Sequence, residues 1–106
     1  MRLLLMRTAV IATAASFLVV ASVRAEDTAA LYKTKCAACH GSDGKGDTAA
    51  GKKLGARDFH SPEVAKMSDE EVFEITKKGK EKMPAYDKKL SDDQIKDLIT
   101  YIRGLK

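Results

Sequence analysis

The amino-acid sequence predicts an all-α fold, and three observations support this prediction. Ser68 and Ser91 are each followed three residues later by Glu or Gln, which is the capping-box pattern of a helix start. Apolar residues after Ser91 recur at intervals of three and four, the spacing of one helix face. No segment shows the sustained apolar–polar alternation that is typical of a half-buried strand.

The first 25 residues have the pattern of a secretory signal peptide. Arg2 and Arg7 give a positive start, residues 8–20 are almost wholly apolar or small, and Ala25 ends a sequence suited to a signal peptidase. We predict cleavage near Ala25, export to the periplasm or an equivalent lumen, and one mature domain over residues 26–106. The alternative is a retained membrane anchor, although the apolar stretch is short for a spanning helix, which needs about 20 residues.

The basic character of the chain belongs mainly to the predicted signal peptide. The whole chain has 19 Lys and Arg against 15 Asp and Glu. Arg2, Arg7 and Arg24 lie in the leader, so the mature domain would carry 16 basic against 15 acidic residues. This near-neutral balance gives no support for nucleic-acid binding.

The mature domain is predicted to begin with a helix. Asp27 or Thr28 can cap its start, and Gly41 is well suited to end it. Residues 41–47 contain three glycines and are predicted to form a loop. Nothing before this loop resembles a strand, which argues against a phosphate-binding loop. Leu54, in the next segment, is predicted to lie in the core.

Three further helices are predicted in the second half of the chain. The sequence Ser61-Pro62-Glu63 is predicted to start a short helix that ends near Lys66, because proline is tolerated at the first helical position. The capping box at Ser68 begins a helix that stops at Gly79.

The last predicted helix is the most clearly amphipathic. It begins at the capping box of Ser91 and stops at Gly104. Its apolar face consists of Ile95, Leu98, Ile99 and Ile102.

Residues 36–40 read Cys-Ala-Ala-Cys-His and hold both cysteines of the chain. C-x-x-C-H is the attachment pattern of c-type haem. Its two thiols can each form a thioether with one vinyl group of a single haem. We therefore predict that Cys36 and Cys39 attach one haem c and that His40 is an axial iron ligand. A domain of about 80 residues also needs a staple such as a cofactor, and a covalently held macrocycle would complete its small core.

Met83 is the predicted second axial ligand. It lies in the polar stretch of residues 80–89, and Pro84 restricts its backbone to an extended conformation. Methionine–histidine ligation of haem iron raises the reduction potential. The alternatives are that Met83 only fills space in the core, as methionine often does, or that Met67 or His60 ligates the iron.

Three other functions use the same residues in different ways. A thiol–disulfide oxidoreductase would need a βαβ pattern, which the sequence lacks. A zinc site would need more ligands than this arrangement offers, and His60 is predicted to be a surface residue. The serious alternative is a haem protein with an open or labile sixth position, gas-binding or peroxidase-like, in which Met83 is only packing.

The motif at residues 36–40, the Met-Pro-Ala-Tyr sequence at residues 83–86 and the final helix together resemble the small monohaem class I c-type cytochromes of bacteria. The resemblance covers essentially the whole mature chain. It implies four or so short helices around one covalent haem, with the N- and C-terminal helices crossing near Tyr32 and Tyr101. Thr28 stands where members usually have glycine. Lys52 matches the position whose carbonyl accepts a hydrogen bond from the ligand histidine.

The resemblance also implies a function. It predicts a soluble, monomeric electron carrier that is not an enzyme and that exchanges single electrons with transient redox donor and acceptor proteins. The alternative is an electron-transfer subunit of a larger membrane complex. Contact with a membrane is expected only through such complexes, unless the leader is retained.

Two sets of residues are expected around the haem. The predicted pocket lining is Leu54, Val72, Ile75, Leu98 and Ile102. Lysines near the ligand segments could contact an acidic partner protein: Lys35, Lys45, Lys80, Lys82, Lys88 and Lys89.

Overall fold

The structure is a computed structural model that describes residues 9, 11 and 17–106. Most of the predicted signal peptide therefore lies outside the described residues. Within them the chain forms six α-helices and no strand, which confirms the all-α prediction. The helices are α1 (Phe17–Lys35), α2 (Ala37–His40), α3 (Ala49–Leu54), α4 (Pro62–Ala65), α5 (Asp69–Lys78) and α6 (Asp92–Arg103).

Three of these helices begin at a serine, as predicted. The side chains of Ser61, Ser68 and Ser91 each accept a hydrogen bond from the backbone N–H three residues later. At Ser91 the box is complete, because Gln94 Oε1 accepts from the Ser91 backbone N–H at 2.9 Å. These caps satisfy N–H groups that have no partner inside the helix, so the sequence sets the starts of α4, α5 and α6 locally.

The first helix differs from its prediction at both ends. α1 begins at Phe17, and Thr28 lies inside it with its hydroxyl donating to the Arg24 carbonyl at 2.9 Å. The start at Asp27 or Thr28 was predicted for the mature chain. In the full chain α1 also runs through residues 17–27, which contain no Gly or Pro that would stop the helix. The helix also ends earlier than predicted, at Lys35, directly before the haem motif, and α2 covers Ala37–His40 within the motif. Within the described residues, no helix is both long and apolar enough to cross a membrane.

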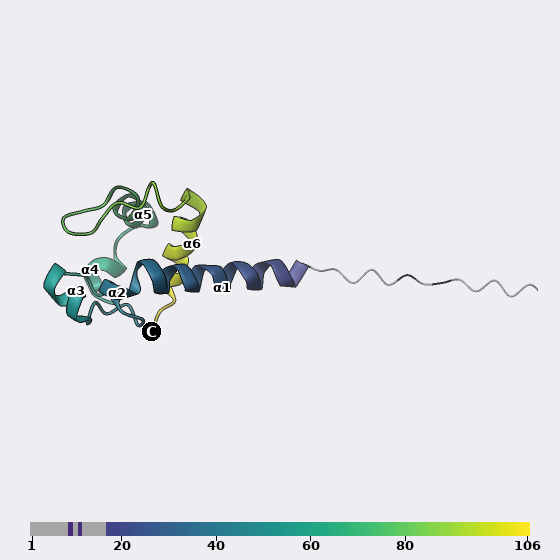
Figure 1. Ribbon diagram of the computed structural model, residues 1–106, viewed down its shortest axis with the longest axis horizontal. Helices are drawn as coiled ribbons and strands as arrows, with labels where there is room; N and C mark the ends of the chain where they lie inside the picture. Colours follow the sequence, from purple (N-terminus) through teal and green to yellow (C-terminus); the bar gives the residue numbers. More distant parts are fainter. Residues whose placement is uncertain (1–8, 10, 12–16) are drawn as a thin grey trace, which may run out of the picture.

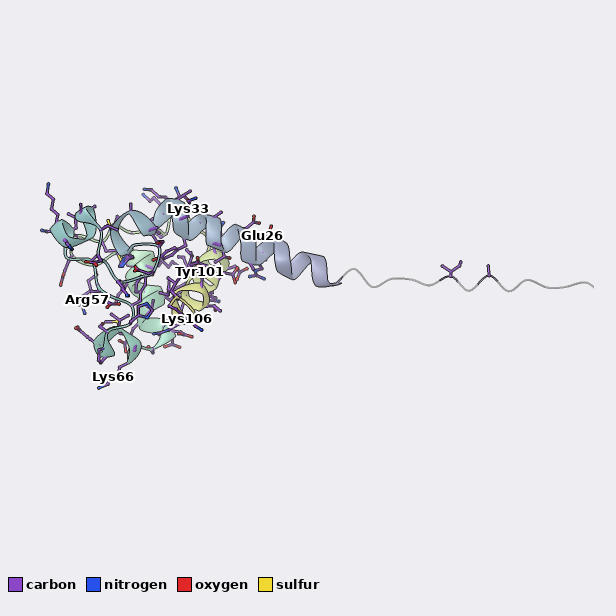
Figure 2. The ribbon with its side chains drawn as sticks, turned by 90° about the horizontal axis from the view of Figure 1, so that it is seen from below. Glu26, Lys33, Arg57, Lys66, Tyr101 and Lys106 are labelled. Atoms are coloured by element: carbon purple, nitrogen blue, oxygen red, sulfur yellow. The ribbon has the colours of Figure 1, made fainter. Side chains whose placement is uncertain are left out.

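The N- and C-terminal helices cross, as the resemblance implied. α6 passes across α1 in Figure 1, and Tyr101 of α6 is labelled beside α1 in Figure 2. The rings of Tyr32 and Tyr101 pack with their centroids 5.1 Å apart and their planes at 43°. An ion pair between Arg24 Nε and Asp97 Oδ2, at 2.7 Å, also joins the two helices. Thr28, in place of the usual glycine, is buried.

The buried core lies mainly between α1, α5 and α6. Its members are Tyr32, Val72, Leu90, Ile95, Leu98 and Ile99. Leu54 is not among them, and 42% of its surface is exposed. The prediction that Leu54 lies in the core is therefore wrong, because α3 packs against α2 and not against the crossed helices.

Candidate haem-binding site

The four predicted site residues line one cavity. Cys36, Cys39, His40 and Met83 all contribute to its wall, and the cavity has a volume of about 430 Å³. This size lies within the range of about 300–1,000 Å³ that is usual for cofactor pockets. The predicted apolar lining is confirmed, because the wall includes Leu54, Val72, Ile75, Leu98 and Ile102. In Figure 1 the loop between α5 and α6 faces the segment that holds α2, α3 and α4, and both contribute lining residues.

Both thiols are carried by one short turn of helix. The backbone N–H groups of Cys39 and His40 donate to the Cys36 carbonyl at 3.3 Å and 3.0 Å. Burial raises the pKa of the Cys36 thiol to about 11, so this thiol is protonated near neutral pH. A redox-active C-x-x-C cysteine instead has a lowered pKa. The environment of Cys36 therefore does not suit thiol–disulfide exchange.

The His40 imidazole is held from two directions. Its Nδ1 lies 3.1 Å from the carbonyl oxygen of Arg57, and its ring stacks on Phe59 with centroids 4.4 Å apart at 19°. Burial lowers the pKa of His40, and the hydrogen bond to Arg57 partly opposes this. A neutral imidazole that donates from Nδ1 keeps its lone pair on Nε2, which is the state that ligates a metal.

The carbonyl beside His40 belongs to a different residue from the one implied. Lys52 lies inside α3, and its carbonyl is not the acceptor. Gly55, with φ of +73°, ends α3 in the left-handed conformation that glycine adopts easily. The chain then turns, and Arg57 presents its carbonyl to the imidazole. The expectation for Lys52 is therefore wrong, although the hydrogen bond itself is present.

A second layer holds the backbone of α2 in place. The Thr48 hydroxyl lies 2.7 Å from the Ala38 carbonyl and 3.0 Å from the Cys39 carbonyl, and it caps α3 by accepting from the Gly51 N–H. Gly51 is buried so closely that an added Cβ would lie 2.1 Å from the Cys39 carbonyl oxygen. α3 therefore packs directly against the turn that carries the thiols.

Sequence reasoning missed four residues around His40: Thr48, Gly51, Arg57 and Phe59. Two of them left a signal. Thr48 is a good N-cap residue placed just before a helix, and Phe59 is one of two large apolar residues between residues 41 and 63. Arg57 contacts His40 through its backbone carbonyl, so the identity of its side chain gave no signal of this contact.

Met83 is placed by a tight turn. Lys80 N–H donates to the Met83 carbonyl at 3.1 Å, and Met83 N–H donates to the Lys80 carbonyl at 2.9 Å. Glu81, at the first central position, has φ of +53°, a conformation that costs a non-glycine residue energy. Met67 also lines the cavity. His60 does not line it and is exposed, with its Nε2 2.8 Å from the Asp43 carbonyl.

Comparison with known proteins agrees with this geometry. Residues 23–102 match the family described as cytochrome c oxidase, cbb3-type, subunit III. The chain belongs to this family of c-type cytochromes. The solved structure of the KustC0563 c-type cytochrome is 40% identical to the chain, with a TM-score of 0.68. The match covers 74% of this cytochrome and 96% of the other chain. A tyrosine-to-phenylalanine mutant of that protein matches at 39% identity with the same TM-score.

Two curated relatives of the chain are cytochrome subunits. A cytochrome bc1 complex cytochrome c subunit of Corynebacterium diphtheriae is 30% identical over 77 residues, which is 72% of this cytochrome. A cbb3-type cytochrome c oxidase subunit CcoP of Azospirillum brasilense is 35% identical over 83 residues, or 76%. The matches cover 25% and 28% of those proteins, so this cytochrome spans about a quarter of the length of the curated relatives it matches.

The domain carries covalently bound haem c, as its family does. The lining of the cavity fits this cofactor. It offers two thiols on one helical turn, a neutral imidazole whose Nδ1 is occupied, and a thioether, all set among apolar side chains. The two thiols belong to the only cysteines of the chain.

Proposed function

We propose that this cytochrome is an exported one-electron carrier whose haem is attached through Cys36 and Cys39 and ligated by His40 and Met83. When bound by these residues, the haem iron would supply one-electron redox chemistry. The observation that carries the proposal is that all four side chains line one cavity while a carbonyl engages His40 Nδ1. Two protein ligands fill both axial positions and leave none open for a substrate, which favours a carrier over an enzyme.

The protein contributes rigidity and a low dielectric. The Arg57 carbonyl and the Phe59 ring restrict rotation of the imidazole. The two hydrogen bonds of the Lys80–Met83 turn restrict the methionine backbone. Apolar side chains from α5 and α6 line the cavity and give it a low dielectric. Ligands that stay in place in both oxidation states keep the reorganisation on electron transfer small.

The alternative for the same cavity is an open or labile sixth position. It predicts that Met83 only packs against the macrocycle, and it leaves Met67 as a second candidate ligand because that residue also lines the cavity. We favour Met83 because its backbone is fixed by the turn.

Absorption spectra of matched variants test the ligand assignment. The purified ferric protein is expected to show a low-spin spectrum with the far-red methionine–iron band. Met83→Ala removes this band, and the matched control Met67→Ala keeps it. A high-spin wild type would contradict the carrier, and loss of the band only in Met67→Ala would contradict Met83 as the ligand.

We further propose that residues 26–106 form the mature protein after cleavage near Ala25, and that it acts in the periplasm or an equivalent lumen. Three lysines at the cavity, Lys35, Lys80 and Lys82, suit a brief encounter with an acidic partner protein. The intact mass of the haem protein from the periplasmic fraction tests the proposed cleavage and location. We expect a monomer with the mass of residues 26–106 plus one haem, and the mass of the full chain would contradict the proposed cleavage.

A second setting is supported by the relatives, which are subunits of bc1 and cbb3 complexes. In that setting the same domain passes electrons inside a larger assembly. Affinity purification from gently solubilised membranes separates the two settings. Stoichiometric co-purification with a respiratory complex favours the subunit, and recovery of the monomer alone favours the free carrier.

A further inference from the structure

A hydrogen bond connects the methionine loop to the haem-attachment segment. The hydroxyl of Tyr86 donates to the backbone carbonyl of Lys35 at 2.8 Å, across 51 positions of sequence. Lys35 is the last residue of α1 and directly precedes Cys36. Tyr86 lies three residues after Met83, and its side chain also lines the cavity. The Tyr86 side chain thus connects the segment that carries the Cys36 thiol to the loop that carries Met83.

The break between α1 and α2 explains why this carbonyl is available. The last carbonyls of a helix have no partner within the helix. At the end of α1, the Tyr32 carbonyl accepts from the Cys36 N–H at 2.9 Å, and the Lys35 carbonyl accepts from the Tyr86 hydroxyl. The tyrosine therefore satisfies a helix end that the haem motif leaves open.

The backbone of Tyr86 is fixed independently of its hydroxyl. Its N–H donates to the Thr76 carbonyl in the last turn of α5 at 3.1 Å, and its own carbonyl accepts from the Leu90 N–H at 2.9 Å. The Tyr86 backbone is therefore bonded to α5, and its hydroxyl is bonded to the end of α1. These two bonds fix the C-terminal end of residues 80–86.

The chain before Tyr86 has little room to adjust. At Gly79 an added Cβ would lie 2.8 Å from the Met83 carbonyl oxygen and 2.9 Å from the Ala85 nitrogen. The methionine backbone thus rests directly on the end of α5. Movement of residues 80–86 toward α5 is blocked by this contact, and movement away from α1 is opposed by the Tyr86 hydrogen bond.

We propose that Tyr86 is a positioning residue for the axial methionine: its hydroxyl holds residues 80–86 against the end of α1, so that Met83 stays on the iron. The inference rests on the proposed ligation by His40 and Met83. Without the hydroxyl, residues 80–86 move away from α1 more often, and Met83 leaves the iron in a larger fraction of molecules.

Imidazole binding to the ferric protein measures that fraction. External imidazole occupies the sixth position only when Met83 has left, so its apparent affinity is proportional to the population of the open state. A neutral hydrogen bond is worth about 1 kcal/mol, so Tyr86→Phe is expected to tighten imidazole binding about fivefold. The far-red band should remain in the absence of imidazole, because most molecules still hold Met83 on the iron.

Tyr32→Phe is the matched control. The Tyr32 hydroxyl also donates to a backbone carbonyl, that of Gly41 at 2.6 Å, but this bond is buried and lies beside His40, whereas the Tyr86 bond is exposed and lies beside Met83. Tyr32→Phe should lower the midpoint of thermal unfolding without changing the affinity for imidazole. Equal tightening in both variants would show a general loosening and overturn the role of Tyr86, as would wild-type affinity in Tyr86→Phe.

The same titration separates failure of this role from failure of the ligand assignment. Met83→Ala gives the affinity of a permanently open position. If the wild type binds imidazole as tightly as Met83→Ala, Met83 is not a ligand, and the proposed function and the role of Tyr86 fail together. If the wild type binds much more weakly but Tyr86→Phe matches it, only the role of Tyr86 fails.

Discussion

The histidine and methionine sides of the haem site are built in different ways. On the histidine side, the ligand lies in the attachment motif itself, and α3 and residues 57–59 pack against it through Gly51, the Arg57 carbonyl and the Phe59 ring. On the methionine side, most residues from 80 to 89 are exposed, and a tight turn, Gly79 and one tyrosine hydroxyl hold the loop.

This difference predicts which substitutions should destabilise the fold and which should affect only the ligation of the iron. The histidine side is an integral part of the packing between α2 and α3. The methionine loop connects two helices that each have their own serine cap and that contact each other directly. We therefore expect substitutions near His40 to lower the free energy of unfolding most, and substitutions near Met83 to alter the iron spectrum with a smaller loss of stability.

The largest effect is expected from Gly51→Ala. Its Cβ would lie 2.1 Å from the Cys39 carbonyl oxygen and 2.7 Å from the Gly46 carbonyl oxygen, so α3 must move away from the attachment turn. Clashes with backbone belong to the rare class of changes that cost about 4 kcal/mol or more. We expect little covalent haem on a denaturing gel stained for haem, and a strongly lowered unfolding midpoint.

Gly55→Ala is the control for Gly51→Ala. Gly55 has φ of +73°, and an added Cβ there meets no atom within 4 Å. The left-handed conformation alone costs about 1–2 kcal/mol for alanine, so haem attachment should be retained. Equal losses in the two variants would contradict the close packing of α3 on α2.

Gly79→Ala should separate ligation from folding. It combines a φ of +78° with contacts of 2.8 Å and 2.9 Å to the backbone of Met83 and Ala85. Backbone strain of this kind costs about 1–3 kcal/mol, and moving the loop relieves it at the expense of the methionine ligand. We expect covalent haem to be retained while the far-red band weakens or disappears. A full band with a lowered unfolding midpoint would show that the loop does not move.

The sequence was sufficient for the parts of this architecture that depend on local chemistry. Serine caps define the starts of α4, α5 and α6, and the five-residue motif identifies three of the four cavity residues predicted as haem ligands. The motif works because its side chains are brought together by a single helical turn, which needs no long-range contact.

Features that depend on distant contacts were missed or misplaced. Leu54 is apolar but lies on a helix that reaches the cavity and not the core. The carbonyl that binds His40 belongs to Arg57 and not to Lys52, because the turn at Gly55 decides which carbonyl arrives there. A backbone acceptor can be supplied by any residue type, so no side-chain pattern marks it. In the full chain Thr28 is an ordinary helical residue and not a cap, because α1 continues through the residues before it.

Phe59→Leu tests the histidine side at smaller amplitude. Leucine keeps most of the buried apolar volume but removes the ring stacked on His40 at 4.4 Å. Such aromatic pairs are worth about 1 kcal/mol beyond the area that they bury. We expect a comparable loss of stability and a shift in the electron paramagnetic resonance g-values of the ferric protein, because the imidazole is freer to rotate. Phe73→Leu, on α5 and outside the cavity, should lower stability without shifting the g-values.

The smallest effect is expected from Glu63→Gln, which bears on how Arg57 supports His40. The Arg57 guanidinium pairs with the Glu63 carboxylate at the surface, with 41% and 70% of the two side chains exposed. Exposed pairs are worth about 0–1 kcal/mol. The contact to His40 comes from the Arg57 carbonyl, and the turn at Gly55 positions that carbonyl without the guanidinium. We therefore expect Glu63→Gln to leave both the unfolding midpoint and the g-values close to those of the wild type. A shift in g-values like that of Phe59→Leu would mean that the surface ion pair sets the position of the carbonyl, and the histidine side would then be less independent of the surface than its packing indicates.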